Sequence, residues 1–129
     1  MIREYYSGWE ALNVQNENGL VADWHPLNYW GDNPKKYIFN ESLGDYGISK
    51  RFVLFIGKKV YVANYPRAIA DLVISKNAKG LKNCVYDYLS DDEAKILYDI
   101  LKPFKDRKDI DGFLRLELTK YYFKEAKNA

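Results

Sequence analysis

The segment between Lys50 and Asn64 constrains the fold most strongly, because it has the composition of a β-hairpin. One apolar run covers residues 52–56, a turn follows at Gly57 and Lys58, and a second apolar run covers residues 60–63. Two such runs joined by a glycine turn predict paired antiparallel strands. The first run is apolar at every position, so we expect both of its faces to be covered inside a sheet.

Helices are predicted on both sides of this hairpin. Tyr5, Trp9 and Leu12 recur at spacings of four and three, which predicts a helix from about Glu4 to Asn18 with Gly19 as its left-handed C-cap. Residues 20–40 contain two prolines and a turn cluster, so we expect extended structure broken by turns and a strand at 36–40.

Three further helices are expected after the hairpin. Asn64 as a cap and Pro66 in the first turn begin a helix that ends at residues 77–80. Residues 90–93 form a capping box, and the helix that follows ends at Pro103. In residues 110–123 the leucines alternate as they would in a strand, but the apolar residues also recur at helical spacing. The length of this segment and the polar tail that follows it favour a helix.

Strands in the middle of the chain with helices at both ends predict an α+β fold. We expect a single domain over residues 1–129, with a small central antiparallel sheet and helices at the N- and C-terminal ends, since 129 residues is the size of one ordinary domain. One cysteine, Cys84, and one histidine, His25, argue against a disulfide scaffold or a conventional zinc site. With no signal peptide or membrane segment in the sequence, we expect a cytoplasmic protein without membrane association.

The net charge of +2 conceals a strongly basic centre. Residues 1–49 carry a net charge of −4, residues 50–84 carry eight Lys and Arg against Asp71 alone, and residues 85–129 carry −1. A local positive field raises the encounter rate with phosphate or with an acidic protein surface. Two interpretations stay open, a contact surface and a set of solvating lysines.

Aromatic residues make up 16% of the chain, which is more large rings than a core of this size easily holds. Some of them are therefore expected at a contact surface. The candidate partner-binding residues join the aromatic segment to the basic centre: Trp24, Tyr29, Trp30, Lys50, Arg51, Lys58, Lys59 and Arg67.

Catalytic and metal-binding motifs are weak in this sequence. Asp23 and His25 would share one face of a strand, but no nucleophile stands near them. Asp106, Asp109 and Asp111 are interleaved with basic residues, as in a solvated loop. The glycines at 44 and 47 lack the rest of a phosphate loop. We therefore expect no catalytic residue, no metal and no cofactor.

Two short motifs stand before and after the predicted hairpin. Residues 5–12 read YYSGWEAL and are followed by Gly19 and Leu20, and residues 67–71 read RAIAD. The first motif is similar to the opening of the conserved region of abortive-infection antitoxins of the AbiEi type, and the second is similar to the start of a later helix in that region. The resemblance covers about residues 4–80. Pro66 replaces the family's usual glutamate, and the match begins so close to Met1 that we expect no preceding winged-helix domain.

The resemblance implies a type IV antitoxin role, in which the protein neutralises or accompanies a nucleotidyltransferase-fold toxin. Our leading expectation is therefore a non-enzymatic protein-binding module. The alternative is a nucleic-acid-binding protein, which would use the cations Lys50, Arg51, Lys58, Lys59, Arg67, Lys76, Lys79 and Lys82. A small enzyme that depends on His25, or a phage-encoded inhibitor of a host protein, comes third.

Overall fold

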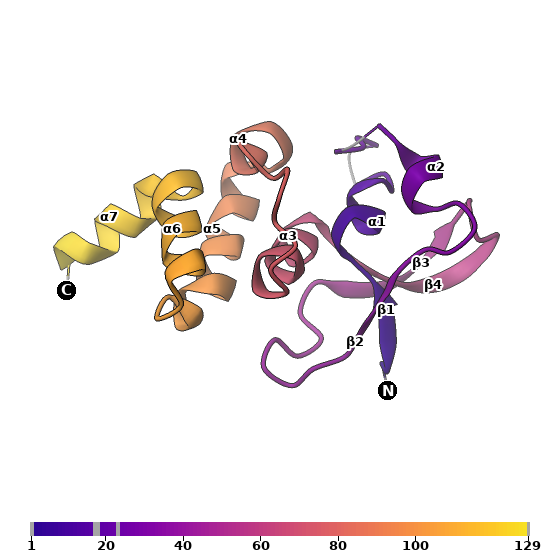
Figure 1. Cartoon of the computed structure of the whole chain (residues 1–129), viewed down its shortest axis with the longest axis horizontal. Helices are drawn as coiled ribbons and strands as arrows, with labels where there is room; N and C mark the ends of the chain where they lie inside the picture. The colour runs from indigo at the N-terminus through magenta and orange to yellow at the C-terminus, as the bar shows by residue number, and fades with distance from the viewer. Residues whose placement is uncertain (1, 17–18, 23, 129) are drawn as a thin grey trace. The chain divides into compact units, whose positions relative to one another are not determined.

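The computed structural model describes residues 2–16, 19–22 and 24–128, the last four by their backbone alone, and has the predicted α+β class (Figure 1). Among these residues it contains seven α-helices and a four-stranded sheet. Two compact units make up the chain, Met1–Ala68 and Ile69–Ala129. The expectation of one domain over residues 1–129 stays a prediction.

The sheet belongs to the first unit. Its strands are β1 (Glu4–Tyr6), β2 (Lys36–Ile38), β3 (Ile48–Val53) and β4 (Lys58–Ala63), in the order β2-β1-β4-β3. β1 pairs with β2 in antiparallel fashion and with β4 in parallel fashion. The sheet is therefore mixed, and the prediction of a purely antiparallel sheet is wrong.

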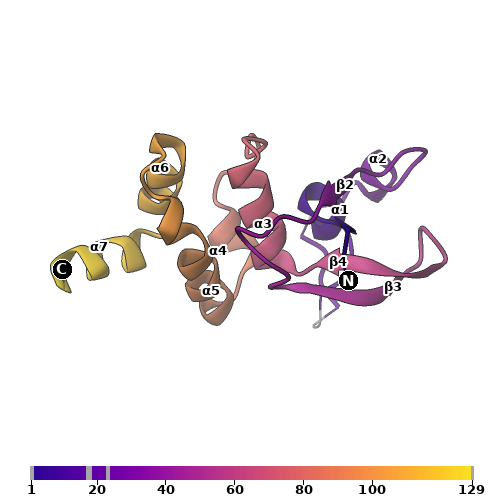
Figure 2. The same ribbon diagram turned by 90° about the horizontal axis from the view of Figure 1, so that it is seen from below.

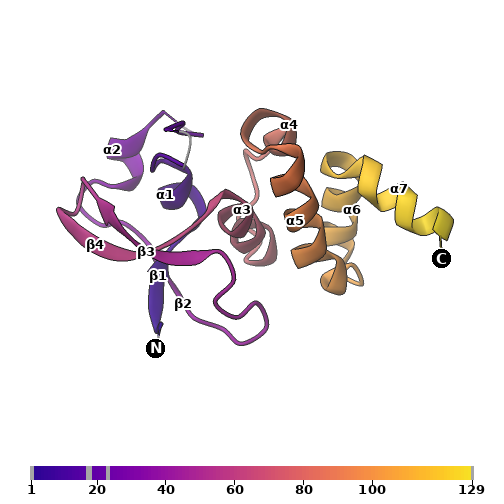
Figure 3. The ribbon, with the colours of Figure 1, turned by 180° about the vertical axis from the view of Figure 1, so that it is seen from behind.

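The predicted hairpin and the strand at 36–40 are confirmed. β3 and β4 pair antiparallel from Ile48 opposite Ala63 to Val53 opposite Lys58, which leaves residues 54–57 as the turn and Lys58 already in β4. The expectation that the first run is covered on both faces is wrong. β3 lies at the edge of the sheet (Figure 3). Phe52 in this strand is 56% exposed.

The helix predicted from Glu4 to Asn18 is also wrong. Residues Glu4–Tyr6 form β1, and α1 covers Gly8–Leu12 alone. Tyr5 and Tyr6 are both buried, as expected of a central strand that is covered on two faces. The apparent helical spacing thus joined a strand residue, Tyr5, to helix residues. Gly19 has a positive φ of 79° but lies far past the end of α1, and Asn18 lies outside the described residues.

The chain between α1 and β2 is held to the first unit by two aromatic side chains. The Tyr65 hydroxyl lies 2.7 Å from the carbonyl oxygens of both Val14 and Leu20, and it accepts a hydrogen bond from Ala22 N–H at 3.2 Å. The Trp30 Nε1 donates to the Glu10 carbonyl at 2.8 Å. Within this stretch lies α2 (Pro26–Tyr29), a single helical turn that the sequence pattern did not indicate.

The helix after the hairpin is confirmed as α3 (Tyr65–Ile74), with the Asn64 Oδ1 accepting from Arg67 N–H at 3.0 Å as a cap. The second unit continues with α4 (Cys84–Tyr88), α5 (Asp91–Leu101), the 3₁₀ turn η1 (Lys102–Phe104), α6 (Lys108–Glu117) and α7 (Thr119–Asn128) (Figure 2). α6 contacts α4, α5 and α7.

Both predictions for the helices of this unit are confirmed. Ser90 and Glu93 form the capping box at α5, with each side chain accepting from the other's backbone N–H, at 3.2 and 3.0 Å. The 110–123 segment is helical, although it breaks at Leu118 into α6 and α7. No helix in the described part of the chain combines the length and the apolar character that crossing a membrane requires.

Candidate functional site

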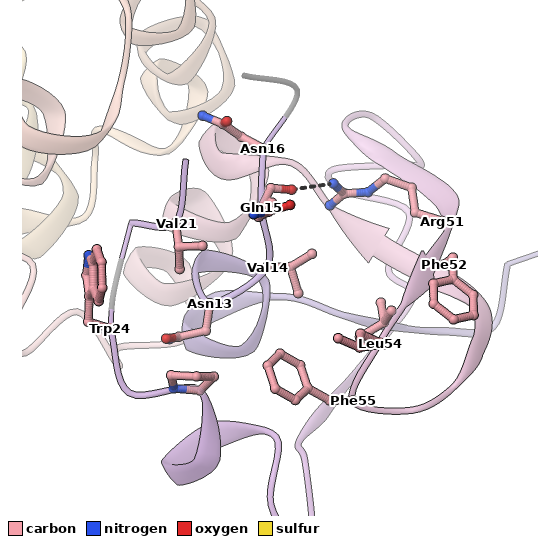
Figure 4. A pocket seen from close by; sticks show the side chains of 12 residues that line it. Asn13, Val14, Gln15, Asn16, Val21, Trp24, Arg51, Phe52, Leu54 and Phe55 are labelled. Atoms are coloured by element: carbon pink, nitrogen blue, oxygen red, sulfur yellow. Dashed lines mark hydrogen bonds between the residues drawn. The ribbon is translucent and has the colours of Figure 1, made fainter. Parts of the chain in front are cut away.

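A cavity of about 570 Å³ lies in the first unit between the β3–β4 hairpin and the chain that follows α1 (Figure 4). Twelve residues line it: Asn13, Val14, Gln15, Asn16, Val21, Trp24, Pro26, Arg51, Phe52, Val53, Leu54 and Phe55. Figure 4 shows Val14, Leu54 and Phe55 among the side chains that line it. We call this cavity the hairpin groove.

Several large apolar side chains of the groove are open to solvent. Trp24 is 83% exposed, Leu54 79%, Phe52 56% and Phe55 45%, and Leu27 beside Pro26 is 77% exposed. Single exposed apolar residues are common on protein surfaces, but a contiguous set around a cavity is typical of an interaction site. The groove is therefore the strongest candidate for a functional surface in this unit.

The turn of the hairpin holds its apolar side chains in place. The Val53 carbonyl accepts from both Ile56 N–H and Gly57 N–H, at 3.1 and 2.8 Å, which closes the turn tightly. Gly57 has a φ of 78°, a conformation that favours glycine. Phe55 lies nearly parallel to Trp30, with ring centres 6.2 Å apart. The groove wall is thus a fixed surface with one ring anchored against a buried tryptophan.

Arg51 joins the two sides of the groove. Its guanidinium donates to the Gln15 carbonyl at 3.3 Å and to the Ala63 carbonyl at 3.2 Å. The first bond links β3 to the chain after α1, and the second links β3 to β4. Arg51 therefore lines the groove, while its charge is already engaged by backbone oxygens; its assignment as a contact residue stays a prediction.

Two of the predicted contact residues are buried, and for them that prediction is wrong. Trp30 is 4% exposed and packs against Tyr6, with ring centres 4.9 Å apart. Arg67 is 0% exposed; its guanidinium donates to the carbonyl of Tyr46 at 2.7 Å and to the hydroxyl of Tyr5 at 3.1 Å. Because both side chains are buried in the interior of the first unit, neither can contact a partner.

The other predicted residues lie at the surface. Trp24 lines the groove, and half-buried Tyr29 stacks on Trp9 with ring centres 6.1 Å apart. Lys50, Lys58 and Lys59 are exposed on the hairpin. Within the first unit the structure therefore brings Trp24 and Arg51 together at the groove and sets the three lysines on its hairpin wall.

The rest of the basic stretch lies in the second unit. Lys76 and Lys79 line a cavity of about 910 Å³ together with Arg107, Lys108 and Asp109, over apolar side chains that include Phe113. We call it the lysine cavity. The Arg107 guanidinium donates to the Asp109 carboxylate and, at 2.9 Å, to the Ile74 carbonyl. Its hydrogen bond holds the pKa of the Asp109 carboxyl below its usual value.

The side chains considered above for catalysis and metal binding have the following surroundings. His25 is exposed, with its backbone N–H bonded to Asn13 Oδ1 at 3.2 Å, and Asp23 lies outside the described residues. Cys84 is buried, and burial raises the pKa of its thiol far above neutrality. Asp109 and Asp111 pair with Arg107 and Arg115. No group of three metal-ligating side chains occurs among the residues that the structure describes.

The apolar residues of the hairpin wall, Phe52, Leu54 and Phe55, were assigned to the core by the sequence pattern. A signal for their true position exists in the sequence. Lys50 and Arg51 precede the apolar run and Lys58 and Lys59 follow it, and lysines are typical of edge strands.

Comparisons with known proteins return no match. No family model matches the chain, and no curated protein or solved structure is significantly similar to it.

Proposed function

We propose that this protein is a non-enzymatic protein-binding module, and that the hairpin groove receives an apolar segment of its partner. The observation that carries this proposal is the set of exposed side chains around one cavity, Trp24, Phe52, Leu54 and Phe55. Protein interfaces are built around such apolar anchors, with aromatic residues enriched at their centres.

The charge of the hairpin defines the chemistry of the partner segment. Residues 46–70 contain five Lys and Arg and no Asp or Glu. Three of these cations, Lys50, Lys58 and Lys59, are exposed on the strands that form the groove wall. An acidic segment with apolar anchors complements both features, since the anchors fill the groove and the carboxylates meet the lysines.

The specific role that we propose is that of an antitoxin in the cytoplasm, which neutralises or accompanies a nucleotidyltransferase-fold toxin. This part of the proposal is supported by the resemblance of residues 5–12 and 67–71 to AbiEi-type antitoxins. The partner would be the product of an adjacent gene.

Co-expression with the adjacent gene product tests the proposal. We expect the two proteins to co-purify and the toxicity of the partner to be relieved. Trp24→Ala and Leu54→Ala should weaken the complex at least about tenfold, because each removes an anchor. Tyr86→Ala is the matched control, since Tyr86 is 86% exposed but belongs to the second unit. A wild-type protein that neither binds the product nor relieves its toxicity overturns the proposal.

A second candidate function, binding of nucleic acid, is favoured by the lysine cavity. Its lining contains four cations and one carboxylate, that of Asp109; the cations are Lys76, Lys79, Arg107 and Lys108. Phe113 provides an aromatic ring on which a base can stack. The measurement is affinity for single-stranded RNA and DNA as a function of salt. Binding that falls steeply with salt and weakens in Lys76→Ala and Lys79→Ala supports this function, and no binding at low salt excludes it.

A further inference from the structure

We infer that the partner segment binds in an extended conformation, as an additional strand on the open edge of β3. This inference rests on the proposed function, because it specifies how the partner is held. β3 ends the strand order β2-β1-β4-β3, so no described residue pairs with its outer edge. An unpaired edge offers backbone donors and acceptors to an incoming strand.

The register identifies the backbone groups that point outward. Asn64 N–H donates to the Gly47 carbonyl at 2.7 Å, which makes Gly47 and Asn64 a hydrogen-bonded pair directly beside the ladder that begins with Ile48 and Ala63. Hydrogen-bonded pairs alternate in an antiparallel ladder. Ser49, Arg51 and Val53 therefore bond to β4, and the residues between them direct their N–H and C=O groups away from it.

Two residues of this outer row are available for pairing. Ile48 N–H is already bonded to the Asp45 carbonyl at 3.1 Å. Lys50 and Phe52 therefore offer an N–H and a C=O each along the open edge. No proline interrupts β3, and its pairing with β4 is continuous over six residues without a bulge. The edge thus lacks two of the devices by which proteins block strand addition.

Three consecutive residues of β3 line the hairpin groove. Consecutive side chains of a strand point to opposite faces of the sheet. Arg51, Phe52 and Val53 nevertheless all line the one groove, so the groove is bordered by the β3 strand itself and not by the side chains of one face alone. A strand added there would place alternate side chains in the groove, where Val14 and Phe55 provide apolar contacts.

The edge also selects the charge of the added strand. Lys50 lies opposite Tyr61 of β4 and Phe52 lies opposite Lys59, so these four residues share one face of the sheet. A residue of the new strand beside Lys50 is favoured if it is Asp or Glu, and one beside Phe52 if it is apolar. Antiparallel addition of a second copy of β3 would place Lys50 opposite Lys50, or, with Lys50 opposite Phe52, Arg51 opposite Arg51. Both registers bring like charges close together, which is unfavourable. The occupant is therefore an acidic, alternating segment of a different protein.

Hydrogen exchange measured by NMR on the full chain, alone and with the adjacent gene product, tests this binding mode. We expect the amide protons of Lys50 and Phe52 to exchange quickly in the free protein and at least about tenfold more slowly in the complex. The amides of Ser49 and Arg51, which face β4, should be protected in both states.

A pair of variants isolates the backbone contribution. Phe52→Pro removes the outward N–H and leaves the bonds to β4 in place, and Phe52→Ala removes the side chain but keeps the N–H. We expect Phe52→Pro to bind about tenfold more weakly than Phe52→Ala. If Phe52→Pro does not fold, as judged by circular dichroism, the exchange data alone decide.

The outcomes separate this inference from the proposed function. Binding that depends on Trp24 and Leu54 but leaves the Lys50 and Phe52 amides fast overturns strand addition and keeps the groove as the contact surface. Absence of binding overturns both. Protection of the two amides in the protein alone, increasing with concentration, assigns the edge to a second copy and overturns the acidic partner strand.

Discussion

Arg67 shows how a charged residue of a basic stretch is used inside a protein. Its side chain is fully buried, and its guanidinium lies 5.2 Å from the ring centre of Tyr5 and donates to the Tyr5 hydroxyl. It also donates to the Tyr46 and Leu43 carbonyls, at 2.7 and 3.4 Å. The residue thereby links α3 to β1 and to the loop before β3.

Arg67→Met is expected to destabilise the protein by about 3 kcal/mol or more. Methionine fills much of the same volume, but it removes the guanidinium from the buried Tyr5 hydroxyl and from the part-buried carbonyls of Tyr46 and Leu43. The loss of a donor to a buried polar group costs about 1–3 kcal/mol. Urea unfolding followed by circular dichroism measures the difference. Lys58→Met is the control, because Lys58 is exposed and its loss should lie within about 0.5 kcal/mol. A similar small effect for Arg67→Met would contradict the structural role.

Glu10 makes the stability of the fold depend on pH. The residue is 8% exposed, and burial raises the pKa of its carboxyl above the ordinary value of 4.5, although the hydrogen bond from Lys35 N–H at 2.7 Å acts in the opposite direction. The folded state therefore binds this proton more tightly than the unfolded state. Its contribution to stability is complete below pH 4.5 and is lost as the pH rises through the raised pKa.

Glu10→Gln should remove this part of the pH dependence. Glutamine keeps an oxygen for Lys35 N–H and cannot ionise, so the variant should gain stability relative to the wild type as the pH rises from about 4 to about 7. Urea unfolding at several pH values across that range gives the comparison. A stability difference that stays constant with pH would show that the carboxyl does not titrate in this way.

Of the three aromatic residues that the sequence suggests as contact residues, only one is largely exposed. Trp24, Tyr29 and Trp30 stand within seven residues of one another, and composition alone does not separate them. Their burial in the structure separates them. Trp24 is exposed at the groove, Tyr29 is half-buried, and Trp30 is buried and packs against Tyr6 and Phe55. The difference depends on contacts with β1 and the hairpin turn, which local sequence does not encode.

At the scale of elements, the loop that leads into β3 depends on a tightly surrounded glycine. Gly44 and Gly47 both have positive φ, 63° and 75°. A methyl group at position 44 would meet nothing within 4 Å, whereas at position 47 it would lie 2.7 Å from Asn64 Oδ1 and 2.8 Å from Arg67 Cβ. The start of β3 therefore packs directly on the first turn of α3.

The two glycines form a matched pair for substitution. Gly44→Ala should cost about 1–2 kcal/mol, the strain of a left-handed alanine. Gly47→Ala should cost about 1–3 kcal/mol more, because the added methyl displaces the capping Asn64 and the buried Arg67. Thermal unfolding of both variants measures the difference. Equal losses would mean that the contact between this loop and α3 can relax without cost.

Elements with strong local signals were predicted, and those that depend on distant pairing were not. The β3–β4 hairpin and α5 carry their turn and capping residues within a few positions, so the sequence pattern was sufficient. β1 has three residues and pairs with β2 and β4, which lie far along the chain. Its identity as a strand follows from those partners, and its spacing alone mimics a helix.

At the scale of the whole molecule, the basic stretch divides into parts with different tasks. Arg67 stabilises the interior, Arg51 joins the walls of the groove, Lys50, Lys58 and Lys59 stand exposed on the hairpin, and Lys76 and Lys79 line the lysine cavity. The positive charge of residues 50–84 is therefore not all available to a partner, since the Arg67 side chain is buried. The lysines of the hairpin are expected to steer a partner, and the apolar groove is expected to retain it.

This division predicts separate effects on the two rate constants of partner binding. Replacing both Lys58 and Lys59 with Glu should lower the association rate about tenfold at low salt, and the effect should fade at about 0.5 M salt as screening shortens the range of the charges. Trp24→Ala should act mainly on the dissociation rate, because it removes an apolar contact that forms after docking. Surface plasmon resonance with the adjacent gene product measures both rates.

A second charge-reversed variant shows whether position or net charge matters. Lys105 and Lys124 are exposed in the second unit, and replacing both with Glu changes the net charge by the same amount as the hairpin variant. If the hairpin lysines steer the partner, this control should retain most of the association rate. Equal slowing by the two variants would show that the partner responds to overall charge and that the hairpin has no special part in the encounter.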